Sequence, residues 1–124
     1  MKRRVLLIGA GGLGAPAALA LAASGASMTL VIVDDDRVER TNLHRQILFT
    51  EQDIGRPKAE TAAAFLRERF SADVEVNEER FVPESAQRLL EGVSLVLEGS
   101  DNFPTKFLAA DACFLSGIPI VHGA

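Results

Sequence analysis

Glycines at positions 9, 11 and 14 follow a short apolar run and reproduce the G-x-G-x-x-G spacing of nucleotide-binding loops. Such a loop presents backbone N–H groups to a phosphate at the start of a helix, because no side chain blocks the approach. Asp34 lies 20 residues beyond Gly14, where an acid is expected to bind ribose hydroxyls. These residues predict a nucleotide site; the alternative is a glycine-rich turn without a ligand.

Asp34 is the first of three consecutive aspartates. We expect Asp34 to bind the ribose, and Asp36 to cap or pair locally. The alternative for the run is an ordinary acidic turn.

Two cations follow in a polar stretch, where Asn42, Arg45 and Gln46 precede Lys58 at the predicted start of a helix. Arginine is a planar bidentate donor and lysine a compact point charge, a pair suited to polyphosphate. A dehydrogenase binds one pyrophosphate largely by backbone, whereas an enzyme that stabilises charge moving through a triphosphate needs such cations. The alternative for Arg45 and Lys58 is solvated surface charge.

Asp101 follows another apolar run and is the third candidate for chemistry. Its carboxylate could hold Mg²⁺ bridging phosphate oxygens, because hard cations prefer oxygen ligands. The same position is equally suited to the N-cap of a helix that begins near Pro104.

Alternating strands and helices must position these residues. The patterns predict strands over residues 3–8, 28–33, 73–80, 93–97 and 118–121, with helices over 12–24, 57–70, 83–91 and 104–116. This order predicts a Rossmann-like, doubly wound α/β fold: a mainly parallel five-stranded sheet with helices on both faces, in one domain over residues 1–124. Ligands bind beyond the carboxyl ends of the strands in such sheets, and the polar clusters fall there.

Composition narrows the possible functions. The net charge of −4 disfavours a nucleic-acid partner, which usually meets a basic face. The single cysteine, Cys113, cannot form an intrachain disulfide, so a reducing cytoplasm is the expected location. Cys113 lies mid-helix among Phe107, Ala110 and Phe114, and we expect it to be a small core residue and not a nucleophile.

The basic start Met1-Lys2-Arg3-Arg4 and the charge-free residues 5–33 are also typical of a signal peptide. Five glycines and Pro16 interrupt that run, and it ends in three aspartates. A buried strand–helix–strand unit gives the same hydropathy. We therefore expect no membrane segment.

Five motifs occur here in the order found in the ThiF/MoeB/HesA adenylyltransferases, the bacterial relatives of ubiquitin-activating enzymes, which this chain resembles over essentially its whole length. They are Gly9-x-Gly11-Gly12-Leu13-Gly14, Asp34-x-Asp36, Asn42-Leu43-x-Arg45-Gln46, Gly55-x-Pro57-Lys58 and Ser100-Asp101-Asn102. The Asn-Leu-x-Arg-Gln motif is the most specific of them.

The resemblance implies ATP and Mg²⁺ in place of NAD, and adenylation of the C-terminal glycine of a small ubiquitin-fold sulfur-carrier protein of the thiamin or molybdopterin type. It implies that Arg45, Lys58 and Asp101 are catalytic, with Asp101 as the Mg²⁺ ligand. The implied nucleotide-binding residues are Gly9, Gly11, Gly12, Gly14, Asp34, Asp36, Asn42, Arg45, Gln46, Lys58, Asp101 and Asn102. Attack of a carboxylate on the α-phosphorus needs positioning and charge neutralisation, and no protein nucleophile.

Family members are longer, so the chain resembles their nucleotide-binding half, either a fragment or a degenerate member. It lacks the N-terminal arm that supplies an arginine to a partner subunit, and the half that carries the carrier surface, zinc ligands and acceptor cysteine. Relatives form homodimers through this half. Contact residues are expected at Leu43, Ile47, Leu48 and Phe49, which could instead fold back over the core.

Three further residues have weaker expectations. Glu98 replaces the aspartate usual in relatives before the Asp101 loop, and this change is either neutral or alters how the loop sits. His44 is expected to serve surface or loop packing and not catalysis. His122 is expected to pack at the end of the last strand; the alternative is that it faces the crevice.

Two other functions stay open. One is an NAD-binding Rossmann oxidoreductase domain. The other is a non-catalytic interaction module, as in paired relatives where one half has lost its ATP residues; the presence of Arg45, Lys58 and Asp101 argues against that loss.

Overall fold

The computed structural model describes residues 2–10, 14–25, 27–40, 49–100 and 102–123. The strands are β1 (Arg3–Ile8), β2 (Met28–Val33), β3 (Asp73–Asn77), β4 (Val93–Glu98) and β5 (Ile120–His122). The helices are α1 (Gly14–Ala23), the 3₁₀ turn η2 (Glu51–Asp53), α2 (Lys58–Phe70), α3 (Pro83–Leu90) and α4 (Phe103–Ser116).

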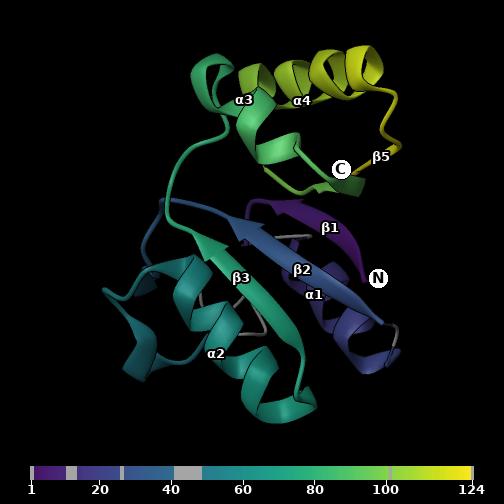
Figure 1. The fold of residues 1–124 in the computed structure, drawn as a ribbon. Coiled ribbons are helices and arrows are strands. Elements are labelled where there is room, and N and C mark those ends of the chain that lie inside the picture. Colours follow the sequence, from purple (N-terminus) through teal and green to yellow (C-terminus); the bar gives the residue numbers. More distant parts are fainter. Residues whose placement is uncertain (1, 11–13, 26, 41–48, 101, 124) are drawn as a thin grey trace.

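The strands form one sheet in the order β3-β2-β1-β4-β5 (Figure 1), and all four neighbouring pairs are parallel. The chain first winds outward from β1 to β3, then crosses to the other side of β1 and continues through β4 to β5. The strand order therefore reverses between β1 and β4. The carboxyl ends of these two strands flank the place where ligands bind in doubly wound sheets.

Strand β1 lies at the centre of the sheet and is buried on both faces. Val5 and Leu7 belong to the core on one face, while Leu6 and Ile8 belong to the core on the other. Successive side chains of a strand point to opposite faces, so a strand covered on both sides must be apolar throughout. The predicted Rossmann-like fold with a parallel five-stranded sheet is confirmed.

Each face of the sheet carries two helices (Figure 1). Helices α1 and α2 cover one face, where α2 contributes Ala62, Ala63 and Leu66 to the core. Helices α3 and α4 cover the other face, where Leu89 and Cys113 are buried. Small alanine side chains bring α2 close to the strands. The prediction that Cys113 is a core residue is confirmed.

The phenylalanines near Cys113 in the sequence point away from the core. Phe107 and Phe114 are 69% and 85% exposed, and Phe107 stacks on Phe103 with ring centroids 6.5 Å apart. Cys113 and Ala109 share the stripe of α4 that faces the sheet, and the phenylalanines occupy the opposite stripe. Phe107 and Phe114 therefore do not belong to the core around Cys113.

Strand β4 runs one residue beyond its predicted end, to Glu98, while β3 and β5 differ more from their predictions. Strand β3 ends at Asn77 instead of residue 80, because the Glu79 N–H turns back to the Asn77 carbonyl at 2.9 Å. Strand β5 begins at Ile120 instead of residue 118, because the Ile118 N–H closes the end of α4 by donating to Cys113. Gly117, at φ +70°, makes that left-handed helix end possible.

The charge-free residues 5–33 do not form one continuous helix. They contain β1, the ten-residue α1 and β2, which lie side by side in the fold. Within the described ranges, no helix combines the length and apolar character that a bilayer crossing requires.

We predict that Leu66→Ala lowers the free energy of unfolding by about 2–5 kcal/mol, because it leaves a cavity between α2 and the sheet. Leu66 is fully buried in this layer. Urea denaturation followed by circular dichroism measures the change.

The matched control is Leu115→Ala on α4, where the side chain is 84% exposed. Its effect should stay within about 0.5 kcal/mol. Equal losses in the two variants would contradict the assignment of the core.

Candidate functional site

The carboxyl ends of β1, β2 and β4 are tied together by backbone hydrogen bonds that continue the sheet. The Gly9 N–H donates to the Val33 carbonyl at 2.9 Å, and the Gly99 N–H donates to the Ile8 carbonyl at 2.8 Å. Segments that lie far apart in the sequence therefore meet at one edge. This edge is where the sequence places its polar clusters.

Gly9 is the residue at which the loop after β1 touches the loop after β4. Its φ is +90°, and a Cβ there would lie 3.1 Å from the Ser100 nitrogen and 3.2 Å from the Gly99 carbonyl carbon. Both the dihedral angle and the contact require glycine. Gly14 begins α1, as the motif predicts, while Gly11 and Gly12 lie outside the described residues.

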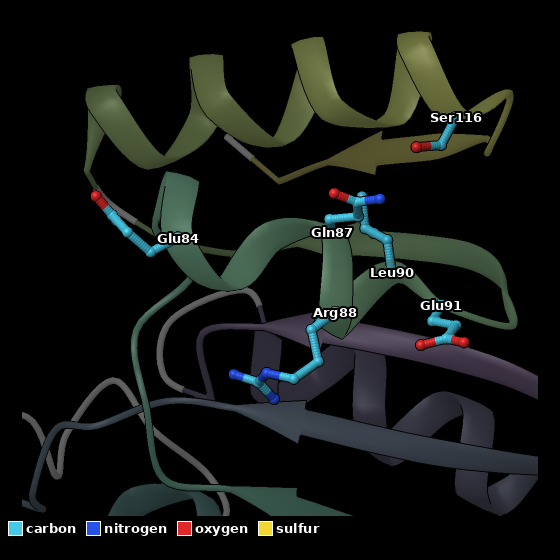
Figure 2. Close-up of a pocket in the computed structure, with 6 residues that line it drawn as sticks. All are labelled: Glu84, Gln87, Arg88, Leu90, Glu91 and Ser116. Atoms are coloured by element: carbon cyan, nitrogen blue, oxygen red, sulfur yellow. The ribbon is translucent and has the colours of Figure 1, made fainter.

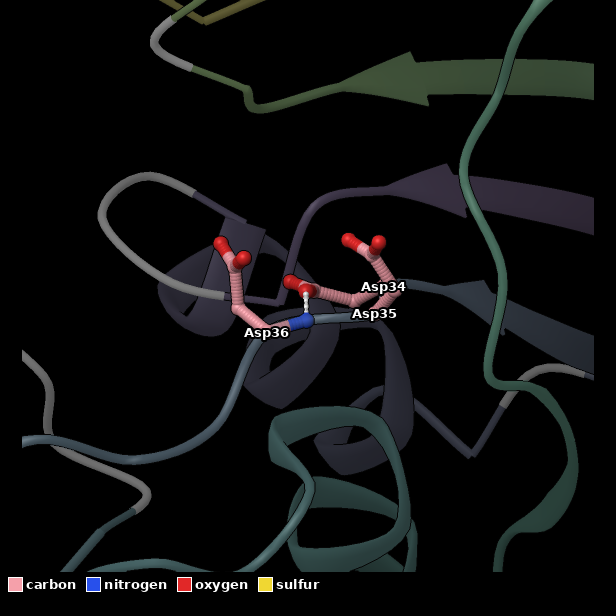
Figure 3. A group of neighbouring side chains, drawn as sticks. All are labelled: Asp34, Asp35 and Asp36. Atoms are coloured by element: carbon pink, nitrogen blue, oxygen red, sulfur yellow. Dashed lines mark hydrogen bonds between the residues drawn. The ribbon is translucent and has the colours of Figure 1, made fainter.

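Asp34 links the tip of β2 to this glycine loop. Its carboxylate accepts hydrogen bonds from the backbone N–H groups of Ala10 and Asp36, each at 2.7 Å (the Asp36 bond is dashed in Figure 3). Burial has the largest influence on the pKa of Asp34 and raises it. The two N–H bonds and the Lys58 charge lower this pKa and the Asp36 charge raises it, so that the pKa lies above its usual value. Each carboxylate oxygen keeps a lone pair for a further donor, such as a ribose hydroxyl.

The neighbouring aspartates serve local structure. Asp36 acts through its backbone, because its N–H bonds Asp34 and its carbonyl accepts from the Lys58 N–H at 2.9 Å. The Asp35 carboxylate pairs with Arg80 at 3.0 Å. One carboxylate oxygen from each of the three aspartates lies within 4.8 Å of the others (Figure 3). The carboxylates of Asp34 and Asp35, however, already accept hydrogen bonds from N–H groups.

Lys58 reaches this edge because residues after β2 pair with residues before α2. Arg37 and Pro57 form an antiparallel bridge, and the Val38 N–H donates to the Arg56 carbonyl at 2.9 Å. The pairing places Lys58 at the first position of α2, next to the aspartate run.

The Lys58 side chain is enclosed, since the residue is only 8% exposed. Within the described part of the chain its ammonium group has no ion-pair or hydrogen-bond partner, although its charge lowers the pKa of Asp34. A buried cation without a partner is costly, so the position favours an anionic ligand. The interpretation of Lys58 as a solvated surface charge is wrong.

Asn102 caps α4, because its side-chain oxygen accepts from the Thr105 N–H at 3.1 Å. The N-cap that the sequence allowed for Asp101 is therefore taken by its neighbour, and that alternative is wrong. Asp101 itself lies outside the described residues.

Glu98 is the site residue that sequence reasoning undervalued. It is 1% exposed and accepts hydrogen bonds from the N–H of Ser100 at 2.8 Å, from the Ser100 hydroxyl, from Lys106 Nζ at 2.8 Å and from His122 Nδ1 at 3.1 Å. Burial alone would raise the pKa of Glu98, but its bonds from Lys106, Ser100 and His122 outweigh it, so that the pKa lies below its usual value.

His122 was expected to pack at the strand end, and that expectation is wrong because it bonds Glu98. A signal for the pair with Lys106 was present, since Lys106 stands eight residues beyond a strand-end acid, on the first turns of α4. No local signal points to His122, which is 24 residues away.

Several predicted site residues lie outside the described part of the chain. They are Gly11, Gly12, Asn42, Arg45, Gln46 and Asp101, together with His44 and the expected contact residues Leu43, Ile47 and Leu48. Phe49 is described and is only 6% exposed, in the core beside Val38. Phe49 therefore folds back over the core and is not a surface contact.

Another hollow lies over α3, lined by Glu84, Gln87, Arg88, Leu90, Glu91 and Ser116 (Figure 2). Glu91 and Ser116 come just before β4 and β5 begin, toward the opposite edge of the sheet from Glu98. Arg88 is paired with Glu79. Nothing in this hollow adds to the strand-end site.

Together the strand-end residues offer a tight backbone loop, a carboxylate with unused lone pairs and an enclosed ammonium group. A ribose hydroxyl fits the carboxylate, and a phosphate chain fits the N–H groups at the start of α1 and the ammonium group. The arrangement suits a nucleotide with more than one phosphate.

Known proteins match this chain both in sequence and in fold. The sequence model of the ThiF family matches residues 1–124. The SAMP-activating enzyme E1 of Haloferax volcanii is 49% identical over 100% of this chain and 46% of its own length. The sulfur carrier protein adenylyltransferase of Thermus thermophilus is 44% identical over 97% of this chain and 44% of its own length.

A solved structure has the same fold. Escherichia coli tRNA N6-threonylcarbamoyladenosine dehydratase, TcdA, in complex with ATP, superposes with a TM-score of 0.89 at 31% identity. The match covers 97% of this chain and 50% of that one. The chain thus spans about half the length of the relatives it matches.

We predict that Gly9→Ala destabilises the protein more than Gly25→Ala, by at least about 1 kcal/mol. Both glycines have positive φ, and the left-handed conformation costs an alanine about 1–2 kcal/mol. Only at Gly9 does the new methyl group also meet backbone; at Gly25 nothing lies within 4 Å. Urea unfolding of the two variants tests this, and equal losses would contradict the close contact with Ser100.

We predict that Glu98→Gln lowers the free energy of unfolding by about 3 kcal/mol at neutral pH, because it leaves Lys106 without its counter-charge. The folded-state pKa of Glu98 is depressed, so its stabilisation is present above the ordinary glutamate pKa and is lost as the pH falls through the folded-state value. The gap between wild type and variant should narrow in acid.

The measurement is urea unfolding across the acidic range. Glu75→Gln is the matched control, because Glu75 pairs with Arg4 on the exposed surface of β3, and its effect should be below about 1 kcal/mol. A gap between wild type and Glu98→Gln that does not change with pH would rule out an ionised Glu98.

Proposed function

The chain belongs to the ThiF family, and on that premise we propose that it is the ATP- and Mg²⁺-binding part of an adenylyltransferase. Its substrate in this proposal is the C-terminal glycine carboxylate of a ubiquitin-like sulfur-carrier protein. The observation that carries the proposal is the enclosed, unpartnered ammonium group of Lys58 beside Asp34, judged over the described residues.

The comparisons support this substrate class over others in the family. The relatives named for SAMP activation and for a sulfur carrier protein are 49% and 44% identical, whereas the tRNA-modifying TcdA is 31% identical. A net charge of −4 also disfavours a tRNA substrate.

In the proposed reaction, an oxygen of the glycine carboxylate forms a bond to the α-phosphorus of ATP. The bond from that phosphorus to the bridging oxygen breaks, and pyrophosphate leaves with the electron pair. The products are an acyl adenylate and pyrophosphate. Two anions must approach each other, so the protein contributes mainly by positioning and by neutralising charge.

Asp34 would hold the ribose, the loop that begins at Gly9 would receive the phosphates, and Lys58 would offset their charge. Asn42, Arg45 and Gln46 are proposed to complete the triphosphate contacts. These roles agree with the position of Asp34 and Lys58 on one edge of the sheet.

Asp101 is the proposed Mg²⁺ ligand. Its sequence neighbour Ser100 packs against Gly9, which supports a metal at the phosphate end of the site. When bound, Mg²⁺ supplies charge neutralisation across the phosphate oxygens. The proposal also takes the protein to be cytoplasmic, because a single cysteine suits a reducing compartment, and homodimeric, as the resemblance implies.

We predict that the chain binds ATP with Mg²⁺ and does not bind NAD, as measured by isothermal titration calorimetry. Lys58→Met should weaken ATP binding about 10-fold or more, because a charge-assisted bond to phosphate is lost. Lys2→Met is the matched control, since Lys2 pairs with Asp73 on the surface. Binding of NAD without any response to ATP would overturn the proposal in favour of an oxidoreductase domain.

Adenylation is tested by exchange of pyrophosphate into ATP with purified ubiquitin-fold sulfur carriers added in turn. Exchange that requires the carrier's terminal glycine supports the proposed reaction. Exchange that persists when that glycine is deleted contradicts it. ATP binding that survives both Lys58→Met and Asp101→Ala unchanged would favour the interaction module instead.

A further inference from the structure

We propose that Glu98 is a positioning residue for the nucleotide site, an inference that rests on the proposed function. Through Ser100, it holds the segment after β4 against the glycine loop, and Lys106 and His122 hold Glu98 from behind. Glu98, Lys106 and His122 lie outside the five motifs, and the Ser100-Asp101-Asn102 motif implies roles only for Asp101 and Asn102.

The first step of the argument is the pair of bonds between Glu98 and Ser100. The backbone N–H of Ser100 donates to Glu98 Oε2 at 2.8 Å, and the Ser100 hydroxyl donates to the same oxygen. A carboxylate that accepts both donors fixes the direction of the chain as it leaves β4.

The second step is where Ser100 sits. Its nitrogen and Cα lie 3.1 and 3.3 Å from the position that a Cβ on Gly9 would occupy. The adjacent Gly99 N–H donates to Ile8 at the end of β1. The position of Ser100, the residue directly before Asp101, is therefore fixed relative to the loop proposed to receive the phosphates.

The third step concerns the other carboxylate oxygen. Glu98 Oε1 accepts from Lys106 Nζ on α4 and from His122 Nδ1 on β5. Lys106 also donates to the Gly123 carbonyl at 2.9 Å. Oε2 thus bonds the loop after β4, while Oε1 bonds α4 and β5.

Stability alone does not account for this arrangement. Replacing a buried ion pair by apolar side chains of similar size is often neutral or stabilising, so the charges are not needed to fill the core. The position of the buried charges accounts for them, because the Glu98 carboxylate bonds Ser100, which directly precedes the proposed metal ligand Asp101. Groups that orient a metal ligand typically change metal affinity when removed.

The test separates Mg²⁺ dependence from nucleotide binding. ATP is titrated into the 124-residue chain by calorimetry over a series of Mg²⁺ concentrations, for wild type, Ser100→Ala and Glu98→Gln. We expect both variants to raise the Mg²⁺ concentration for half-maximal ATP binding, by about 10-fold in Glu98→Gln. Affinity for ATP without Mg²⁺ should not change, because Asp34 and Lys58 lie on other elements.

Two further variants, Glu98→Asp and Glu75→Gln, are added, and Ser100→Ala also guards against misfolding. Glu98→Asp keeps the carboxylate and should fall between wild type and Glu98→Gln. Ser100→Ala removes only the hydroxyl group, so it provides the test of the positioning role if Glu98→Gln does not fold. Glu75→Gln, which breaks an exposed ion pair on β3, should leave the Mg²⁺ dependence unchanged.

The outcomes distinguish the two proposals. Wild-type protein that does not bind ATP overturns the proposed function. Wild-type protein that binds ATP, with folded Ser100→Ala and Glu98 variants that need no more Mg²⁺ than wild type, overturns the positioning role alone. An equal loss of ATP affinity with and without Mg²⁺ assigns Glu98 a purely structural role and also overturns it.

Discussion

The close approach of two backbones, at Gly9 after β1 and at Ser100 after β4, is the constraint on which the candidate site depends. β1 is the central strand, and the strand order reverses between it and β4. The contact leaves no space for a side chain at Gly9. The loops that follow β1 and β4 are therefore brought to the same place. Asp34 completes the edge because it accepts a hydrogen bond from Ala10, the next residue of that loop.

Two acids on either side of β1 are held in different ways, and this difference separates their roles. Burial is the leading influence on Asp34 and leaves its pKa raised, and its oxygens keep capacity to accept from a ligand. Glu98 is enclosed by three donor residues that leave its pKa lowered. Environments that push two carboxyl pKa values in opposite directions indicate different tasks. In the proposed function Asp34 binds the ligand, whereas in the proposed positioning role Glu98 bonds within the protein and holds the loop.

The family match and the fold alone would not define the substrate. A solved structure that matches with a TM-score of 0.89 is a tRNA-modifying enzyme, whereas a sequence relative is named a sulfur carrier protein adenylyltransferase. The scaffold therefore serves more than one chemistry. What the scaffold supplies is the strand-end edge, where an enclosed lysine and an aspartate from separate elements lie close enough to interact. The proposed function therefore rests on this pair of side chains, and the positioning role of Glu98 extends it to the loop that carries Asp101.

The sequence by itself determined the fold class, the five strands and the polar strand ends, because apolar periodicity and glycine spacing are local properties of the chain. It also indicated Gly9, Asp34 and Lys58 correctly as residues of one sheet edge. Only the tertiary structure decided that Lys58 is enclosed, that Asn102 caps α4 and that β5 begins after the helix cap at Ile118. Only the tertiary structure shows that Glu98 bonds His122. The two residues lie on the neighbouring parallel strands β4 and β5, and their pairing depends on how the connecting helix packs, which no local sequence pattern records.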